Sequence, residues 1–153
     1  VRLLPCPRGL RPFVLIVEKD ASFVQLLERG FLRRFPHGIL VTGVGQPDFA
    51  TRSLVRLLTG PPFSLPALAL CDADPHGFEI MAVYKFGSLA QCHEPALAAP
   101  AVDWLGVWPS EIQALRLPPA CRLPLSEADV RKAQQLALRV YMPAYPRWVR
   151  EME

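Results

Sequence analysis

The stretch FVLIVEKDASFVQLL, residues 13–27, places a continuous apolar run directly before a segment with helical spacing. Residues 13–17 are apolar at every position, which is typical of a strand covered on both faces of a parallel sheet. Asp20 stands where a helix N-cap is expected, and apolar side chains then recur at near-helical spacing until Pro36. The stretch therefore predicts a strand over 13–17 and one helix from Asp20 to about Pro36.

The same order of apolar run and amphipathic segment repeats along the rest of the chain. Further strands are predicted at 39–41, 67–71 and 102–107, and further helices at 48–58, about 78–84 and from Ser126 onward. Clusters of proline separate several of these elements. The alternation predicts an α/β domain, with a mostly parallel sheet flanked by helices and a helical segment at the C-terminus.

The spacing of apolar side chains also assigns an inward face to two of the predicted helices. In the helix over 48–58 we expect Arg52 and Arg56 to point outward, and the expected inward residues are Leu54, Leu57 and Leu58. The helix from Ser126 opens with a capping pattern. Its expected inward stripe is Val130, Ala133, Leu136, Ala137 and Val140.

The composition describes a folded chain without a membrane-spanning segment. The 153 residues suit one domain, and a content of 51% hydrophobic and 20% charged residues excludes a disordered chain. No apolar run approaches the ~20 residues that span a bilayer, so we expect no membrane partner. The chain starts at Val1 without a secretory pattern, which we interpret as a processed chain or a fragment.

The charge balance and the cysteines narrow the class of protein only a little. A net charge of +3 does not by itself indicate nucleic-acid binding. The four cysteines are widely spaced and form no Cys-x-x-Cys pair, which argues against a zinc site or a disulfide framework. Cys71 lies in an apolar run and is expected to be a buried thiol, so we expect a reducing, intracellular compartment.

Acidic residues follow two of the predicted strands. Glu18 comes after the first strand, and Asp72 and Asp74 come after the third. Ligands of such sheets bind beyond the carboxyl ends of the strands, and an Asp-x-Asp tip can bring two carboxylates together. Such oxygen ligands suit Mg²⁺, which can neutralise phosphate oxygens. The alternatives are that Asp74 is only an N-cap before Pro75 and that Glu18 is a solvated strand end.

Glycines and basic residues near these acids are candidate contacts to a phosphate backbone. The candidates are Lys19, Gly43, Gly45, Arg52, His76 and Lys85. The glycine loop would allow close approach of the backbone to a phosphate, and the charged side chains would supply attraction. Each also has a simpler explanation, because a glycine pair is often a turn, and lysines and a lone histidine are often solvated surface residues.

The opening VLIVEKDASFVQLL first resembles a two-component receiver domain. Receivers carry two adjacent acids after the first strand, whereas Lys19 follows Glu18 here. They also carry a lysine near the end of a later strand. Past Lys85 the only lysine is Lys132, which lies in the predicted last helix. We therefore reject the receiver interpretation.

A second resemblance covers most of the chain. Toprim domains place a Glu after the first strand and Asp-x-Asp after the third, and this chain resembles the Toprim domain shared by the meiotic double-strand-break transesterase and the topoisomerase VI A subunit. The matching stretches are IVEKDASFVQLL (16–27), VTGVGQPDFATR (41–52), CDADPHGFEIMAVYKFGS (71–88) and DWLGVWPSEI (103–112). His76 and the WLG-PS block make the chain more similar to the meiotic protein than to the archaeal enzyme.

The resemblance implies a fold, a metal and a division of the chain. It implies a Toprim domain over 13–125, a truncated C-terminal helical segment of the same domain over 126–153, and a linker remnant over 1–12. It implies Mg²⁺ bound through the residues that match the family's acids, which are Glu18, Asp72 and Asp74.

The resemblance also implies an activity, partners and a place of action. The family, of the ATP-hydrolysing type IIB DNA topoisomerases, cuts double-stranded DNA by tyrosine attack and leaves a tyrosyl link to a 5′ end. It implies a homodimer, action in the nucleus, and a partner in the form of a topoisomerase VI B-like subunit.

The chain departs from the family pattern in ways that affect activity. The family's winged-helix domain, which carries the nucleophilic tyrosine, is missing here, and none of Tyr84, Tyr141 and Tyr145 matches that tyrosine. Relatives often carry Lys where this chain has Val44, and they continue with further C-terminal helices. We expect no DNA cleavage by this chain alone. The alternatives are a stand-alone Toprim nuclease or primase-like enzyme, and an inactive DNA-binding or dimerisation fragment.

Overall fold

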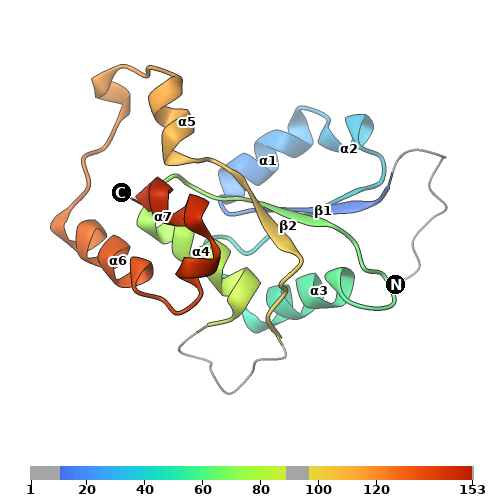
Figure 1. The fold of residues 1–153 in the computed structure, drawn as a ribbon. Coiled ribbons are helices and arrows are strands. Elements are labelled where there is room, and N and C mark those ends of the chain that lie inside the picture. The colour runs from blue at the N-terminus through green and yellow to red at the C-terminus, as the bar shows by residue number, and fades with distance from the viewer. Residues whose placement is uncertain (1–10, 89–96, 153) are drawn as a thin grey trace.

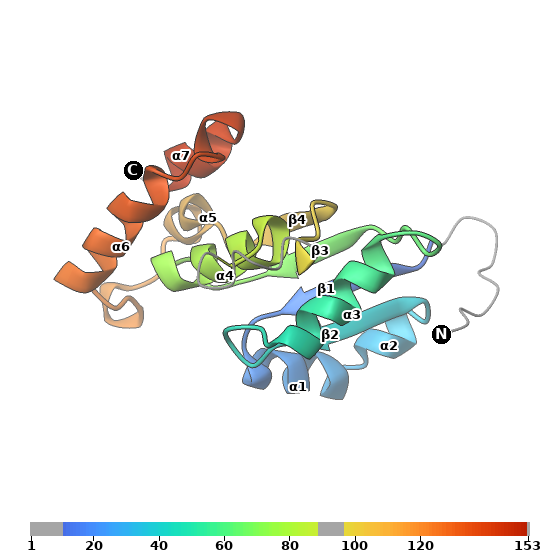
Figure 2. The ribbon, with the colours of Figure 1, turned by 90° about the horizontal axis from the view of Figure 1, so that it is seen from below.

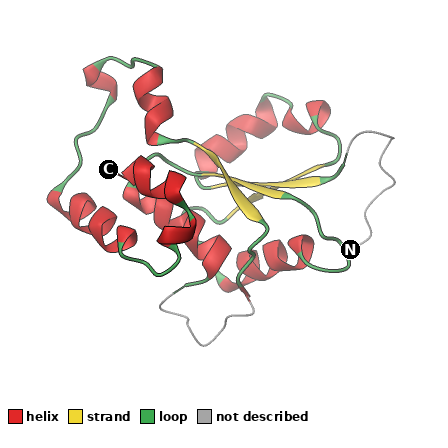
Figure 3. Ribbon diagram, in the orientation of Figure 1, coloured by secondary structure: helices red, strands yellow, loops and turns green. Residues whose placement is uncertain are grey.

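The computed structural model describes residues 11–88 and 97–152. Its centre is a four-stranded parallel sheet in the order β2-β1-β3-β4, with helices on both sides (Figures 1 and 3). The strands are β1 (Phe13–Val17), β2 (Gly38–Thr42), β3 (Ala67–Leu70) and β4 (Val102–Gly106). The prediction of an α/β fold with a parallel sheet is confirmed, whereas residues 1–10 of the predicted linker lie outside the described residues.

Helices cover the two faces of the sheet unequally. The helices are α1 (Asp20–Glu28), α2 (Phe31–Arg34), α3 (Phe49–Thr59), α4 (Pro75–Phe86), α5 (Pro109–Ala114), α6 (Glu127–Ala137) and α7 (Pro146–Met152), with 3₁₀ turns at Pro119–Cys121 and Met142–Ala144. Helices α1 and α2 lie on one side of the sheet and α3 and α4 on the other (Figure 1). Helices α6 and α7 lie together, away from α1 and α2 (Figure 2).

The apolar run of β1 has the environment that its sequence predicts. Val14 and Ile16 point into the larger core cluster, which also contains residues of α3, α4, α6 and α7. Leu15 and Val17 point to the opposite face and pack with Phe31 of α2. Because side chains alternate across a strand, a strand covered on both faces must be apolar at every position.

The predicted single helix over 20–36 is wrong in two details. Lys19, not Asp20, is the N-cap residue of α1, and its side chain makes no capping hydrogen bond. Gly30 has a φ of 80° and separates α1 from α2. Glycine adopts this left-handed conformation without steric cost, and for that reason it ends many helices. Amphipathic spacing continues across the break, so the sequence pattern alone does not reveal it.

The predicted inward face of α3 is only partly confirmed. Arg52 is only 1% exposed, whereas Leu54 and Leu57 are 40% and 45% exposed. The buried stripe runs through Arg52, Val55 and Leu58, which follow one another at the spacing of one helical face. Arg56 points outward and Leu58 inward, as expected. Arg52 thus occupies a buried position of this helix, whereas two leucines that the apolar pattern placed inward are exposed.

The predicted stripe of the last helix is only partly confirmed. Leu136 of α6 is buried, but Val130 and Val140 are 44% and 97% exposed. Helix α6 ends at Ala137, so Val140 lies beyond it, and Ala137 itself is exposed. Within residues 11–88 and 97–152, no helix has the length and apolar character needed to cross a membrane.

An aromatic cluster joins α4, β4 and α7. The ring of Phe78 meets Trp104 and Trp148 edge to face, at centroid distances of 5.3 and 5.1 Å. All three side chains are nearly inaccessible to solvent. Edge-to-face pairs of buried aromatic rings contribute beyond the burial of their area. The cluster anchors the N-terminal half of α4, which begins directly after the acidic segment Asp72–Asp74.

Candidate functional site

Glu18 and Asp72 meet at the carboxyl ends of the two central strands. The backbone N–H of Glu18 donates to the carbonyl of Leu70 at 3.0 Å, so the pairing of β1 with β3 extends to the acids. Glu18 Oε2 accepts a hydrogen bond from the backbone N–H of Asp72 at 2.8 Å. This contact joins residues 54 positions apart in the chain. The parallel pairing therefore brings the first and third strand ends together, as the sequence predicts.

Asp74 caps the helix that follows. Its carboxylate Oδ1 accepts from the backbone N–H of Gly77 at 2.8 Å, and Pro75 occupies the first turn of α4. A Cβ on Gly77 would stand 2.3 Å from the carbonyl oxygen of Asp72, so only glycine fits there. The simpler explanation of Asp74 as an N-cap is therefore correct, and it leaves the second carboxylate oxygen available to a ligand.

The three carboxylates lie within electrostatic reach of one another. Burial raises the pKa of Glu18 above its ordinary value, the hydrogen bond from Asp72 opposes this, and the negative charges of Asp72 and Asp74 raise it further. Burial and the same three carboxylates raise the pKa of the neighbouring Cys71 thiol, which is buried as expected. Such mutual repulsion is an unfavourable arrangement that a cation would relieve.

Lys19 already supplies one positive charge to this cluster. Its ammonium forms an ion pair with Asp72, and the lysine side chain is 61% exposed. The hydrogen bond to Asp72 is the main reason that the pKa of Lys19 is raised. The structure thus brings Lys19 to the acids, at the solvent-facing edge of the cluster.

The donor set matches a hard divalent cation in its chemistry. All three side chains offer carboxylate oxygens, which are the ligands that Mg²⁺ prefers. One oxygen of each is held by a protein group: Lys19 for Asp72, the Asp72 N–H for Glu18 and the Gly77 N–H for Asp74. As arranged, no three His, Cys, Asp or Glu side chains of the described residues form a group that could hold a metal ion.

The glycine loop after β2 is tied to the same strand end. The backbone N–H of Gly45 donates to the carbonyl of Glu18 at 3.0 Å. Gly45 has a φ of 93°, and a Cβ placed on it would meet nothing within 4 Å, so its backbone is open to an approaching group. Gly43 is confined instead, because its Cβ would stand 2.9 Å from the Tyr84 hydroxyl. Val44 between them is 68% exposed and also has a positive φ.

Arg52 and Lys85 do not join the acids. The ammonium of Lys85 is buried and donates to the carbonyls of Pro100 and Val102 at 2.8 and 2.6 Å and to Asp103 at 3.1 Å. These acceptors stand at the start of β4, at the opposite end of the sheet. The buried Arg52 lies beside Gly87, just beyond the C-terminal end of α4. Of the three candidate basic residues, the structure thus pairs Lys19 with an acid of the cluster, and it places Lys85 at the start of β4 and Arg52 beside Gly87.

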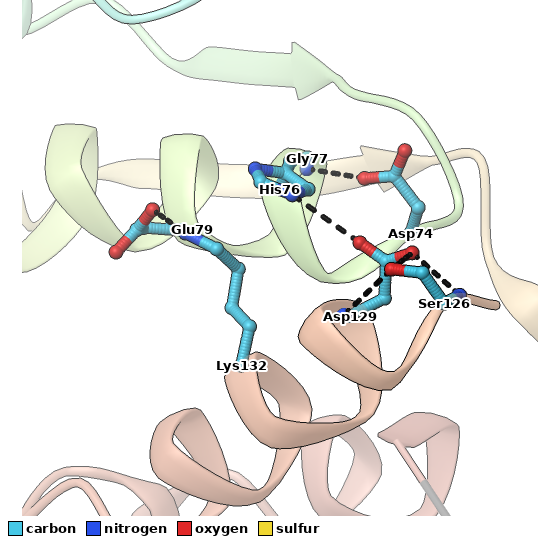
Figure 4. Close-up of polar contacts among 7 residues, drawn as sticks. All are labelled: Asp74, His76, Gly77, Glu79, Ser126, Asp129 and Lys132. Atoms are coloured by element: carbon cyan, nitrogen blue, oxygen red, sulfur yellow. Dashed lines mark hydrogen bonds and ion pairs between the residues drawn. The ribbon is translucent and has the colours of Figure 1, made fainter.

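His76 faces α6 (Figure 4). Its Nε2 lies 3.3 Å from Oδ1 of Asp129, and one turn further along α4 Glu79 pairs with Lys132 of α6. Sequence reasoning missed Glu79, Asp129 and Lys132 as neighbours of the acidic segment. The capping pattern at Ser126–Asp129 was a signal for the start of α6, but nothing local indicated which helix α6 would contact.

The comparisons with known proteins agree with the observed α/β fold. Residues 13–153 match the family defined by the Toprim domain of Spo11 and of the topoisomerase 6 A subunit. The chain is 44% identical over 142 residues to the meiotic recombination protein SPO11 of Homo sapiens, a match that covers 92% of this chain and 36% of that protein. Toprim domains generally bind a divalent metal ion, typically Mg²⁺.

Plant topoisomerase 6 proteins are similar to a nearly equal extent. The chain is 42% identical over 142 residues to the A3 subunit of DNA topoisomerase 6 from Oryza sativa subsp. indica, covering 92% of this chain and 32% of that protein. It is 40% identical over 141 residues to the A subunit of DNA topoisomerase 6 from Arabidopsis thaliana, covering 92% of this chain and 33% of that protein. The chain thus spans about a third of the length of the curated relatives it matches.

Proposed function

The chain belongs to the Spo11/topoisomerase 6 A family, and we propose that it is the Mg²⁺-binding part of a protein that breaks double-stranded DNA in meiotic recombination. One observation supports the proposal: Glu18 accepts from the Asp72 N–H at the carboxyl ends of β1 and β3, and the charges of Asp72 and Asp74 both reach Glu18. This is where ligands of such sheets bind. The relatives are named as a meiotic recombination protein and as DNA topoisomerase 6 A subunits. The proposal extends this action on DNA to the present chain.

In this proposal the three carboxylates would hold Mg²⁺, which would supply positive charge to phosphate oxygens. Lys19, whose exposed ammonium pairs with Asp72, would exchange this ion pair for a contact to a DNA phosphate. The open backbone at Gly45 admits the sugar-phosphate chain beside the strand ends. Glu18 keeps its contact with the Asp72 N–H, which maintains the spacing of the acids.

The nucleophile is proposed to come from outside this chain. Tyr84 is 1% exposed, and burial raises the pKa of its hydroxyl. Tyr141 stacks on Phe86 at a centroid distance of 3.9 Å, and burial raises the pKa of its hydroxyl as well. A nucleophile needs access to substrate and a base or a lowered pKa. We therefore propose that a winged-helix domain supplies the tyrosine, and that this chain alone does not cleave DNA.

The proposal includes the assembly and the place of action. A two-fold homodimer would place the tyrosine of one protomer at the acids of its partner, and a topoisomerase VI B-like subunit would be the further partner. Residues 13–125 and 126–153 are proposed to form one domain, because Leu136, Met142 and Trp148 belong to the same core as β1. Action on chromosomal DNA implies the nucleus.

Calorimetric titration of Mg²⁺ into residues 1–153 tests the metal assignment. Asp74→Asn keeps an N-cap side chain but removes a charge, so we expect at least about tenfold weaker binding with an intact fold. Glu127→Gln is the matched control, because it removes the charge of a 93% exposed carboxylate on α6. Equal Mg²⁺ binding by parent, Asp74→Asn and Glu127→Gln would contradict the metal assignment.

Incubation with labelled duplex DNA and Mg²⁺ separates the proposed function from its alternatives. We expect DNA binding without any covalent protein–DNA product. A covalent product would contradict the assignment of the nucleophile to another domain. Hydrolysis without a covalent link would favour a stand-alone nuclease, and DNA binding that ignores both Mg²⁺ and the acids would favour an inactive binding fragment.

A further inference from the structure

Helix α6 contacts the N-terminal half of α4 through two polar contacts (Figure 4). His76 Nε2 lies 3.3 Å from Asp129 Oδ1, and Lys132 Nζ lies 2.5 Å from Glu79 Oε2. The contacting residues are three positions apart on both helices, so the two contacts lie on one face of each helix. The Lys132 and Glu79 side chains are 27% and 30% exposed, which strengthens their attraction relative to a fully solvated pair.

Asp129 is held in place before it meets His76. Its Oδ2 accepts from the backbone N–H and the hydroxyl of Ser126 at 2.9 and 2.7 Å, and the Ser126 hydroxyl accepts from the Asp129 N–H at 3.2 Å. This capping box leaves Oδ1 to face His76. Because the carboxylate is fixed by its own helix, little side-chain freedom is lost when the two helices meet.

His76 lies in the first turn of α4, and Asp74 is the N-cap residue directly before that turn. The Asp74 carboxylate accepts from the Gly77 N–H, and the Asp74 carbonyl accepts from the Phe78 N–H at 3.0 Å. On its other side this turn presses against Asp72, where no Cβ fits on Gly77. The turn is thus held between the end of β3 and α6, and a displacement of α4 would move the carboxylate of Asp74 relative to Glu18.

We propose that Asp129 and Lys132 of α6 are positioning residues, which hold the first turn of α4 so that Asp74 stays within the acidic cluster. This inference rests on the proposed function, since it names what sets the geometry of that metal site. His76 then serves the contact between the two helices. Neither α6 residue touches the metal or the DNA in this proposal, and both act through His76 and Glu79.

The test compares two substitutions that remove the same charge from the same helix. Lys132→Met abolishes the contact with Glu79, whereas Arg131→Met removes an exposed side chain whose ion-pair partner, Glu127, lies on α6 itself. In residues 1–153, amide hydrogen exchange followed by NMR reports on the Gly77 and Phe78 N–H groups that bond to Asp74. We expect about fivefold faster exchange at both in Lys132→Met and no change in Arg131→Met.

Mg²⁺ titration of the same proteins gives the second readout. We expect threefold to tenfold weaker binding, roughly, in Lys132→Met, unchanged binding in Arg131→Met, and recovery in Lys132→Arg, which can still reach Glu79. Unchanged exchange at Gly77 and Phe78 in Lys132→Met would overturn the positioning role. Equal acceleration of the α3 amides would overturn it too, because the effect would then be global unfolding.

The two proposals fail in distinguishable ways. A parent chain that binds no Mg²⁺ overturns the metal assignment, while the exchange rates still decide whether α6 holds the turn. A parent that binds Mg²⁺ no more tightly than Lys132→Met overturns the positioning role alone.

Discussion

The two ends of α4 each lie near a lysine, and the two lysines have opposite environments. Lys19 stands before the N-terminal end, exposed and paired with the carboxylate of Asp72. Lys85 stands at the C-terminal end, where it is 5% exposed and donates to two carbonyls and Asp103. The sequence predicts the same role for both. A charge that is near an acidic motif in the chain is therefore not always near that motif in space.

The largest expected effect follows from removing the buried lysine. Lys85→Met leaves the carbonyls of Pro100 and Val102 and the carboxylate of Asp103 without their donor, so the free energy of unfolding should fall by about 3 kcal/mol. Urea unfolding of residues 1–153 measures this. A loss below about 0.5 kcal/mol would place Lys85 among ordinary surface lysines and remove the contrast between the two ends.

Glu18→Gln should raise the free energy of unfolding at pH 7, whereas Lys85→Met should lower it. Burial and the charges of Asp72 and Asp74 raise the pKa of Glu18 in the folded chain. At a pH between the ordinary and the raised pKa, the folded chain therefore binds a proton on Glu18 that the unfolded chain has lost. Stability therefore falls as pH rises from the ordinary pKa through the raised one. The glutamine variant should be more stable than the parent at pH 7, and the difference should vanish below the ordinary pKa.

The same Glu18 substitution should also remove a proposed Mg²⁺ ligand. We expect Mg²⁺ to raise the unfolding midpoint of the parent and to have little effect on Glu18→Gln. Urea unfolding at several pH values, with and without Mg²⁺, measures both effects. A variant that is less stable than the parent at pH 7 would contradict the raised pKa of Glu18.

Ser126→Ala should have an intermediate effect on stability, at the start of α6 where Asp129 contacts His76 of α4. It removes the N-cap of α6 and its hydrogen bonds to Asp129, so we expect a loss of about 1 kcal/mol in stability. The hydrogen bond that the Ser126 hydroxyl donates to the Asp129 carboxylate is the largest reason that the pKa of Asp129 is lowered. An NMR titration should therefore find the Asp129 pKa closer to its ordinary value in the variant, and an unchanged pKa would refute the capping box as its cause.

The smallest expected effect on stability belongs to Lys19. Lys19→Met removes an exposed ion pair and should change the free energy of unfolding by about 0.5 kcal/mol or less. Duplex DNA binding should nevertheless weaken uniformly across sequences, and the slope of log affinity against log salt should drop by about 1. An unchanged salt slope would remove Lys19 from the proposed phosphate contacts.

Much of the sheet and of its acidic edge was predictable from local patterns. The apolar runs of β1 and β3 and the acids that follow them were visible in the sequence, because strand burial on two faces and parallel pairing impose simple rules. The break at Gly30 was not visible, because one glycine within an amphipathic pattern is also compatible with an uninterrupted helix. The inward turn of Arg52 was missed because periodicity counts apolar residues and ignores a buried charge.

Local patterns in the chain were enough to predict the four strands, their alternation with helices and the acids at two strand ends, and the resemblance of four stretches indicated the family to which the chain belongs. These features depend on neighbours in the chain and on short motifs. The packing of the folded chain was needed to show that Lys85 serves the opposite end of the sheet and that α6 packs on α4, a contact between residues 53 positions apart. Such partners depend on how helices pack around a shared core, and local spacing carries no information about that packing.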